Sequence, residues 1–560
     1  MRCKNVSGLD ASRRNLLSVG LALTVASAAR SSPAEESAAD VAFDRGLHRI
    51  TLDRTVSGSL TLAPGALLEI AAGVRLTLLG DLIAPAAHIF TGEGRVQLDR
   101  SRVLVARPEW WGAVPDDPGI DCAEPIEAAL RAHPHVQLGA GDYHLQRKLR
   151  VDIPNRRLWG VGRANDARGT RLVGHAADGP VLLIGTDLPP ATINDYLRGI
   201  DLRSIEVARN SPAPAREADD PDVVTGVMIR HVLDCRFESV RANEHAIGFS
   251  ARGAVRTYLV DCQAFRSVFL HENDDSFIGF DLDGRHAPIS TGANASLYLV
   301  DCNARTGNRP QLKLSVGCRI LGAFSDTFLI RFETTEVAQG ILVDGLSSSL
   351  SAAQRRIGHL NLHIDTPVLD QCSHVCLLLQ NLSDCAMVDI AAPWLALASS
   401  GEAALRMVDC HGATSIIGGQ IVGPEGADRT GIQLTRVSGL ALSGTKLLRC
   451  AWPIEAQASR GLDLVAAILA QGANGPAAVS LRKCEASYVR AGVMAAGGGY
   501  AVGVSLEDCE NVTVETAGLA GVAVHQGIRV EGAVRAHRTG SMVSVGTSRQ
   551  HEGPSTMREL

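Results

Sequence analysis

Aromatic residues are scarce in this 560-residue sequence, at 4% of the chain. Beyond the first 30 residues, no segment reaches the roughly 20 unbroken apolar residues that a membrane helix requires. Positive charge is in slight deficit, with a formal net charge of -6, which argues against a nucleic-acid partner because such a protein needs a basic stripe. No Pro-rich or Ser-rich linker divides the middle of the chain, which favours one elongated, repetitive domain.

Short apolar runs separated by turns are abundant. Hydrophobic residues make up 46% of the chain, and 56 glycines punctuate runs of Val, Leu, Ile and Ala. Within 41–105, the runs 59–62, 67–70 and 75–78 alternate with Gly or Pro turns, and no Asn-Gly or Asp-Gly hairpin turn separates them. This pattern predicts an all-β chain that winds in coils.

The N-terminus has the order of an export signal. Arg13 and Arg14 precede the largely apolar stretch 17–29, which contains an Ala-Ser-Ala triplet at 26–28. The arginine pair resembles a twin-arginine signal, and a general secretory signal with two incidental arginines is the alternative. We expect 1–29 to be removed and the mature protein to be periplasmic or secreted, without insertion into the membrane.

A short helix is expected over 121–133. Asp121 is a plausible N-cap, Pro125 lies in the first turn, and Ile126, Ala129 and Leu130 fall on one face. This helix could close one end of the core.

The segments around this helix have a specific resemblance. The run 108–113 (Pro-Glu-Trp-Trp-Gly-Ala), the helix, the run 136–143 and the run 158–162 look like the opening of the pectate-lyase-like superfamily, which includes phage tailspikes. The resemblance implies a right-handed parallel β-helix, a solenoid in which the helix caps the N-terminal end. The stretch 114–119, which precedes the helix, departs from the family pattern, so the resemblance supports the fold more than any one activity.

A dipeptide recurs along the chain. After residue 220, Asp-Cys units end at Cys235, Cys262, Cys302, Cys410 and Cys509, and looser versions end at Cys385, Cys450 and Cys484. Several intervals are 25 to 27 residues long, which is typical of one solenoid coil. The expected organisation is therefore an export signal at 1–29, N-terminal β-rich coils at 30–107, a parallel β-helix at 108–535 and a polar C-terminal tail at 536–560.

Thirteen cysteines in an exported chain could indicate disulfides. Because most of them follow a polar residue at a corresponding point of a coil, we expect a buried ladder of free thiols. Disulfides and a metal site remain the alternatives, although the sequence contains no Cys-x-x-Cys pair.

The aspartate of each repeated unit should point outward where the cysteine points inward. Asp234, Asp261 and Asp301 would then form a carboxylate row, with separations of about 5 Å if they lie on neighbouring coils. Such a pair suits a retaining glycosidase, and we take Asp261 and Asp301 as candidate catalytic residues. The alternative is a structural corner, because Asp is a common turn former.

The densest polar cluster occupies 271–275 and continues through Asp281 and Asp283 to His286. Its carboxylates and histidine could perform acid/base chemistry on a sugar or hold Ca²⁺, which prefers oxygen ligands. A solvated loop would have a similar composition. The candidate catalytic residues of this cluster are His271, Glu272, Asp274 and Asp275.

Two further features allow a binding interpretation and a structural one. Trp110 and Trp111 could stack on sugar rings or pack at the end of the barrel. The basic residues Arg147, Lys148 and Arg150 could bind an acidic glycan or form a solvated charged face.

The resemblance and the acidic cluster lead to a functional expectation. We expect an exported enzyme that cleaves a bacterial or plant polysaccharide as a lyase or a glycoside hydrolase, with Ca²⁺ as the cofactor it could use. The alternatives are a glycan-binding or surface-structural protein without catalysis, and a polysaccharide epimerase or transferase. Tailspike relatives form trimers, so a homotrimer is one oligomeric state open to the chain.

Overall fold

The structure is a computed structural model of the whole chain. It describes residues 35–37, 39–163, 169–175, 179–210, 224–267, 276–284, 294–307, 314–345, 359–426, 428–494, 498–515, 519–520, 524–532, 535–539 and 556–559.

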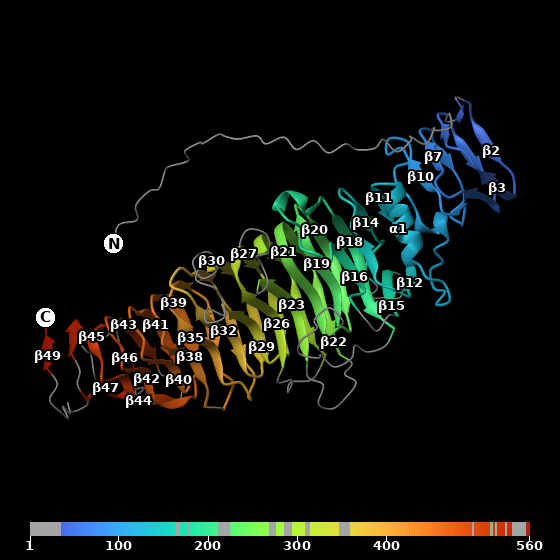
Figure 1. The fold of residues 1–560 in the computed structure, drawn as a ribbon. Coiled ribbons are helices and arrows are strands. Elements are labelled where there is room, and N and C mark those ends of the chain that lie inside the picture. The colour runs from blue at the N-terminus through green and yellow to red at the C-terminus, as the bar shows by residue number, and fades with distance from the viewer. Residues whose placement is uncertain are drawn as a thin grey trace, which may run out of the picture.

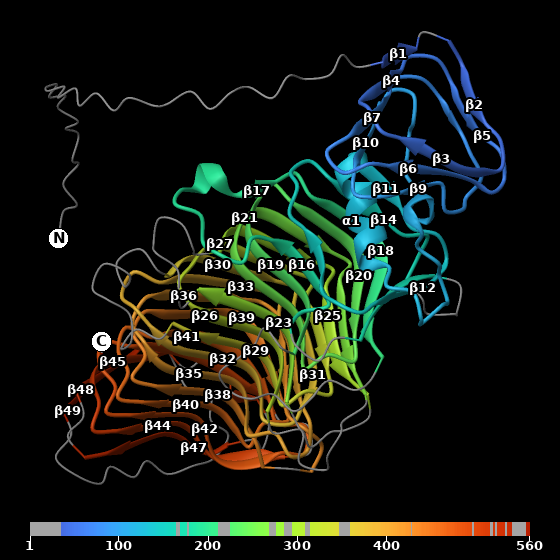
Figure 2. The ribbon, with the colours of Figure 1, turned by 45° about the vertical axis from the view of Figure 1, so that its right-hand side comes forward.

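Three small parallel sheets form the N-terminal part and enclose a common interior (Figure 2). Paired residues on successive coils are 19 to 22 residues apart here, as in Glu35 with Arg54, Gly46 with Ala66 and Leu60 with Leu82. The sheets consist of β1 (Glu35–Ser37), β4 (Arg54–Val56), β7 (Arg75–Leu78) and β10 (Arg95–Leu98); of β2 (Val41–Phe43), β5 (Leu60–Leu62) and β8 (Leu82–Ile83); and of β3 (Gly46–Ile50), β6 (Ala66–Ile70) and β9 (Phe90–Thr91).

Two helical segments follow these sheets, η1 (Pro108–Trp111) and α1 (Ala123–Ala132). The N-cap of α1 is Cys122, so the expectation that Asp121 would cap the helix was wrong by one residue, although the Asp121 carboxylate accepts the backbone N–H of Ala123. Its apolar face is buried as expected, and α1 packs against β10, β11 and β13 between the two parts of the β structure (Figure 1).

The rest of the described chain forms one 39-stranded sheet that winds as an elongated rod (Figure 1). Each turn of the chain contributes strands to three faces, and each strand pairs in parallel with the strand of the next turn. Long strands such as β18, β20, β21, β39, β41 and β43 bend around a corner and take part in two faces.

The first face, face 1, contains β13 (Leu149–Val151), β16 (Leu182–Gly185), β19 (Thr225–Leu233), β21 (Ile247–Val260), β23 (Phe277–Gly284), β26 (Ser315–Gly322), β29 (Gln339–Asp344), β32 (Val375–Leu382), β35 (Ala403–Cys410), β38 (Thr430–Thr435), β40 (Trp452–Gln457), β42 (Asn474–Arg482), β44 (Gly499–Glu507) and β47 (Val524–Glu531). Face 2 contains β11 (His135–Gln137), β14 (Arg157–Trp159), β18 (Asp201–Arg209), β20 (Arg236–Asn243), the second half of β21, β24 (Asn294–Val300), β27 (Phe324–Ile330), β30 (His359–Asp365), β33 (Met387–Ala391), β36 (Ala413–Ile417), β39 (Leu440–Leu448), β41 (Asp463–Leu469), β43 (Tyr488–Met494), β45 (Glu510–Glu515), β48 (Arg535–Thr539) and β49 (Thr556–Glu559). Face 3 contains β12 (Gly141–Leu145), β15 (Thr170–Gly174), the second halves of β18 and β20, β22 (Gln263–Arg266), β25 (Asn303–Thr306), β28 (Glu333–Thr335), β31 (Val368–Cys372), β34 (Trp394–Leu397), β37 (Gln420–Val422), the second halves of β39, β41 and β43, and β46 (Leu519–Ala520); β17 (Leu197–Arg198) pairs with β19 near a corner, and η2 spans Ile193–Asp195.

Beyond residue 535, where we expected a polar tail, β48 and β49 continue the parallel pairing. Within the described residues, no helix is long and apolar enough to cross a membrane.

Apolar side chains of all three faces meet in one continuous interior. Alternate residues of each strand point inward, and Phe249 and Phe280 stack there with ring centroids 4.9 Å apart. Burying a side chain of this size contributes about 2 kcal/mol. Because each coil buries its apolar residues against the next, the interior is stable only as a stack of coils.

The corners between faces are formed by residues with left-handed backbones. One corner is occupied on successive coils by residues with φ between 49° and 54°: Asn381, Asp409, Arg436, Ala458, Lys483 and Asp508. A second corner contains Asp261, Asp301, Arg331, Thr366 and Ala392, and a third contains Asp234, Arg256, Ser296, Asp326 and Asn361. Asp and Asn tolerate this conformation better than most residues, which explains why Asp recurs at these corners.

The cysteine that follows each corner aspartate points into the interior. All the described cysteines are free, and all are buried except Cys385, as the thiol-ladder prediction requires. The ladder is divided, however, because Cys235, the pair Cys262 and Cys302, and the set that includes Cys484 follow three different corners. Burial raises the pKa of Cys235 to about 11, so its thiol stays protonated and unreactive.

Candidate active site

The structure describes only part of the acidic cluster noted in the sequence. His271, Glu272, Asp274 and Asp275 lie outside the described residues, so their role, and that of Ca²⁺ among them, stays a prediction. The described chain contains no group of three or more His, Cys, Asp or Glu side chains placed to hold a metal ion.

The structure brings two members of the predicted aspartate row together. The backbone N–H of Asp261 donates to Val300, which places Asp261 beside Asp301 on the next coil. Asp234 belongs to another corner, where it lies beside Arg256. The row of three carboxylates is therefore reduced to a pair.

The two carboxylates of this pair bind different partners, which lie on opposite sides of the pair. Asp261 accepts hydrogen bonds from Ser239 on the preceding coil, at 2.7 Å, and from Arg163, at 3.0 Å. Asp301 accepts two from Arg331 on the following coil, at 2.5 and 2.7 Å. The Arg331 guanidinium lowers the pKa of Asp301, so this carboxylate stays ionised. This geometry fits the structural-corner interpretation better than a shared acid/base pair.

A second carboxylate pair lies on face 1. Phe280 and Leu282 of β23 point into the core, so the alternating residues Asp281 and Asp283 point outward. The neighbouring strands place Ser250 beside Asp281 on one side and Arg319 on the other. We call Ser250, Arg252, Asp281, Asp283 and Arg319 the central polar group.

Each aspartate of the central polar group is paired with an arginine from an adjacent coil. Asp281 accepts from Nε of Arg319 at 2.8 Å, and Asp283 lies 3.4 Å from Nε of Arg252. Both carboxylates are fully buried, whereas the exposed fractions of the Arg319 and Arg252 side chains are 11% and 22%. A buried charge is tolerated only when it is paired, which explains the arginines.

Some hydrogen-bonding capacity of this group is unused. Among the described residues, Oδ2 of Asp281, Nη2 of Arg319 and Oγ of Ser250 are buried and have no hydrogen-bond partner. Buried polar atoms are nearly always satisfied, so three unsatisfied atoms on adjacent strands need an explanation. A polar ligand bound over face 1 would satisfy them.

The spacing of the two aspartates suits hydrolysis. Residues two apart on a parallel strand are roughly 6.6 Å apart at Cα. Inverting glycosidases place their two carboxyl groups about 6.5–9.5 Å apart, which leaves room for a water molecule. The sequence contained a signal for this pair, because two acidic residues alternate with apolar ones inside the β-rich run 277–284.

A buried histidine lies near the start of β21. His245 accepts from Nε of Arg209 at 3.2 Å, and its Nε2 lies 3.1 Å from the carbonyl of Val207. Burial, reinforced by the Arg209 charge, lowers the pKa of His245 to about 3, so the imidazole is neutral at ordinary pH. Burial also lowers the pKa of Arg209, to about 10.

An aromatic ladder runs along face 2. Tyr258, Tyr298, Phe328 and His363 stack on successive coils, with ring centroids 4.5 to 4.8 Å apart and nearly parallel planes. Because each inner ring presents both faces to its neighbours, only ring edges and the two end faces can meet a ligand. The ladder therefore stabilises the stack of coils and is a poor platform for sugar rings.

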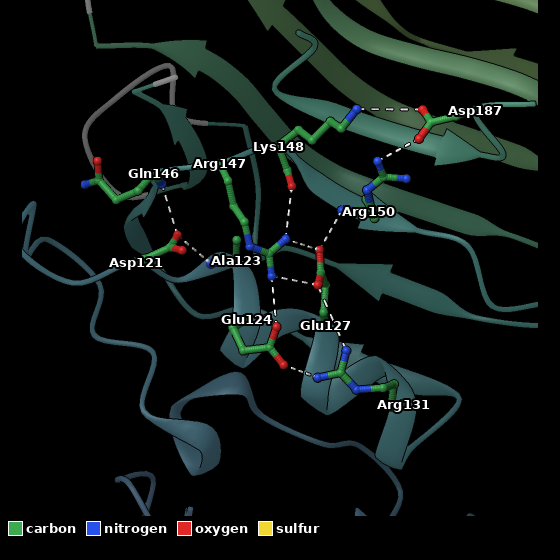
Figure 3. A network of polar contacts seen from close by, with 10 residues as sticks. All are labelled: Asp121, Ala123, Glu124, Glu127, Arg131, Gln146, Arg147, Lys148, Arg150 and Asp187. Atoms are coloured by element: carbon green, nitrogen blue, oxygen red, sulfur yellow. Dashed lines mark hydrogen bonds and ion pairs between the residues drawn. The ribbon is translucent and has the colours of Figure 1, made fainter. Parts of the chain in front are cut away.

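The basic run 147–150 is compensated by carboxylates (Figure 3). Arg147 donates to both oxygens of Glu127 on α1, at 2.7 and 2.8 Å, and Arg150 donates to Asp187 at 2.7 Å. These contacts attach α1 to the first turns of the large sheet. The network supports the structural interpretation of this run over glycan binding.

Comparison with known proteins supplies likenesses in fold. The sequence matches no model of a known protein family and no curated protein. Every described pairing between successive coils is parallel, and three faces enclose one interior. This parallel, three-faced arrangement is the architecture that the resemblance to the pectate-lyase-like superfamily implies. The resemblance expected from 108–162 is thereby confirmed.

Three solved β-helix structures illustrate the likeness. The mannuronan C-5 epimerase AlgE6 A-module of Azotobacter vinelandii is 13% identical, over 78% of this chain and 100% of that one, with a TM-score of 0.38. Tailspike protein 3 of bacteriophage CBA120 is 9% identical, over 79% and 62%, with a TM-score of 0.44. DFA-IIIase from Arthrobacter chlorophenolicus A6 is 11% identical, over 69% and 94%, with a TM-score of 0.41. Similarities of this size do not define an activity.

Proposed function

We propose that this β-helix protein is an exported enzyme that cleaves a polysaccharide by hydrolysis, with the central polar group as its catalytic centre. The observation that carries the proposal is the pair Asp281 and Asp283, two arginine-paired carboxylates that alternate on one strand of face 1. The export-type sequence at 1–29 supports a periplasmic or secreted location, where polysaccharides are accessible substrates.

The pairing assigns a role to each carboxylate. Asp281, held at 2.8 Å by Arg319, activates a water molecule through its unpartnered Oδ2. Asp283 makes the longer contact, 3.4 Å from Arg252, and donates a proton to the oxygen of the leaving sugar.

We also infer that the coils wind in a right-handed sense and that α1 caps the N-terminal end of the large sheet. Parallel crossovers are right-handed in nearly all proteins, which supports a right-handed β-helix. The position of α1 between β10 and the first strands of the large sheet supports its role as the N-terminal cap.

The test is hydrolysis of a panel of acidic and neutral polysaccharides, with and without Ca²⁺, by the wild type and by Asp281→Asn and Asp283→Asn. We expect new reducing ends with the wild type and a loss of at least about a hundredfold in either variant. Asp301→Asn is the matched control, because it removes the same charge from an exposed corner and should retain activity.

Other results would reject the proposal. Ultraviolet absorbance of unsaturated uronates would establish a lyase instead of a hydrolase. If no polysaccharide of the panel yields reducing ends or ultraviolet absorbance, or if both folded variants keep full activity, the glycan-binding or sugar-rearranging alternatives are favoured.

A further inference from the structure

A cleft separates the N-terminal coils from the cap helix. Its volume is about 1150 Å³, and it lies between β10 and one side of α1. The helix contributes Glu124, Pro125, Ala128 and Arg131, whose spacing places them on one helical face. The opposite face of α1, with Ile126 and Ala129, is buried in the core.

The cleft carries an excess of positive charge. Five arginines and three carboxylates line it. Arg75 and Arg95 pair in register on β7 and β10, so these like charges start about 4.8 Å apart. Among the described residues, neither side chain has a partner in an ion pair, whereas Arg131 is bound by Glu124. Adjacent unpaired like charges repel, and an anion bound between them would relieve that repulsion.

Aromatic rings lie at the end of the cleft. Trp111 lines it with Phe90 and His88, and the Trp111 and Phe90 ring centroids are 5.2 Å apart. Gly112, with a left-handed φ of 95°, ends η1 directly after Trp111. Trp110, by contrast, is buried and donates to the carbonyl of Pro85 at 3.2 Å. The tandem tryptophans therefore differ: Trp110 is buried, whereas Trp111 is only partly buried against the core and lines the cleft.

The cleft continues around the C-terminal end of α1. A second hollow of about 260 Å³ shares Arg131, Ile153 and Arg156 with the first and extends to Arg150. Two adjoining hollows of this kind suit an extended ligand better than a single small ion.

We propose that this cleft binds a segment of an acidic saccharide chain. Carboxylates of the ligand pair with Arg75 and Arg95, and an apolar sugar face packs on Trp111. The cleft is formed by other residues than the central polar group, so the proposal does not depend on hydrolysis.

The test is calorimetric titration of the purified chain with oligogalacturonate, and with a neutral maltooligosaccharide of equal length. We expect binding of the acidic oligosaccharide alone, about tenfold weaker for each arginine removed in Arg75→Ala/Arg95→Ala. Trp111→Ala should weaken it as well. Arg45→Ala/Arg49→Ala, which removes two charges from the N-terminal coils outside the cleft, should bind as the wild type does.

Three results would overturn the proposal. The first is an absence of binding of the acidic oligosaccharide to the wild type. The second is equal binding by the cleft variant and the control variant. The third is retention of full affinity in Trp111→Ala together with equally tight binding of inorganic sulfate, which would show a simple anion site and no recognition of sugar.

Discussion

Removal of the Asp281 charge should destabilise face 1 far more than removal of a surface charge. In Asp281→Asn, Arg319 keeps its charge while its side chain is 11% exposed and its counter-ion is gone. Breaking a buried ion pair in this way costs about 3–5 kcal/mol, because the remaining charge stays desolvated. In Asp301→Asn, the partner Arg331 is 57% exposed, so the cost is about 0–1 kcal/mol. Asn also tolerates the left-handed corner of residue 301.

Amide hydrogen exchange measures this difference in stability strand by strand, because individual coils open locally. A loss of about 3 kcal/mol accelerates exchange in β23 and β26 by roughly 150-fold, whereas Asp301→Asn should change exchange in β24 and β27 by less than about fivefold. Replacing the pair by apolar residues, Asp281→Leu with Arg319→Met, should recover most of the loss. Equal exchange in the two single variants would refute the reasoning.

Two further outcomes follow from burial. The pKa of His245 falls from 6.5 to about 3 on folding, so between these values the unfolded chain binds a proton that the folded chain does not. Stability should therefore decrease as the pH falls through this window, by up to about 1.4 kcal/mol per pH unit, and urea titrations of His245→Gln should show a flatter dependence. Cys385 is exposed while the other described cysteines are buried, so a thiol reagent should label it first, and Cys385→Ser should remove that rapid phase. An unchanged rapid phase would contradict the described position of Cys385.

Much of the fold could be predicted from the sequence because the coils repeat. The left-handed corner favours Asp, and the interior accepts a small apolar residue after it, so Asp-Cys units indicate coil corners; the interval from Cys484 to Cys509 is one coil, whereas Cys235 and Cys262 follow different corners. Helix α1 could be predicted because its apolar residues recur with the period of a helix.

The candidate site could be predicted only in part. Left-handed residues stand at more than one corner of the coils, and the same dipeptide serves any of these corners, so the sequence could not show that Asp234 and Asp261 lie at different corners. Asp281 and Asp283 were noted beside the acidic cluster, but their pairing with Arg319 and Arg252 depends on strands about 35 residues away in either direction. The N-terminal cleft has walls from segments far apart in sequence, each of which has the composition of an ordinary surface.

The uniform pairing of the coils makes the length of the rod adjustable in evolution. Ile432, Ile454, Val479 and Val504 follow one another in register on face 1, and each depends only on its two neighbours. Duplication or loss of one such unit would leave every other contact intact, as long as the two new neighbours match. Chains of this kind can therefore lengthen or shorten by whole units while the chemistry near Asp281 stays unchanged.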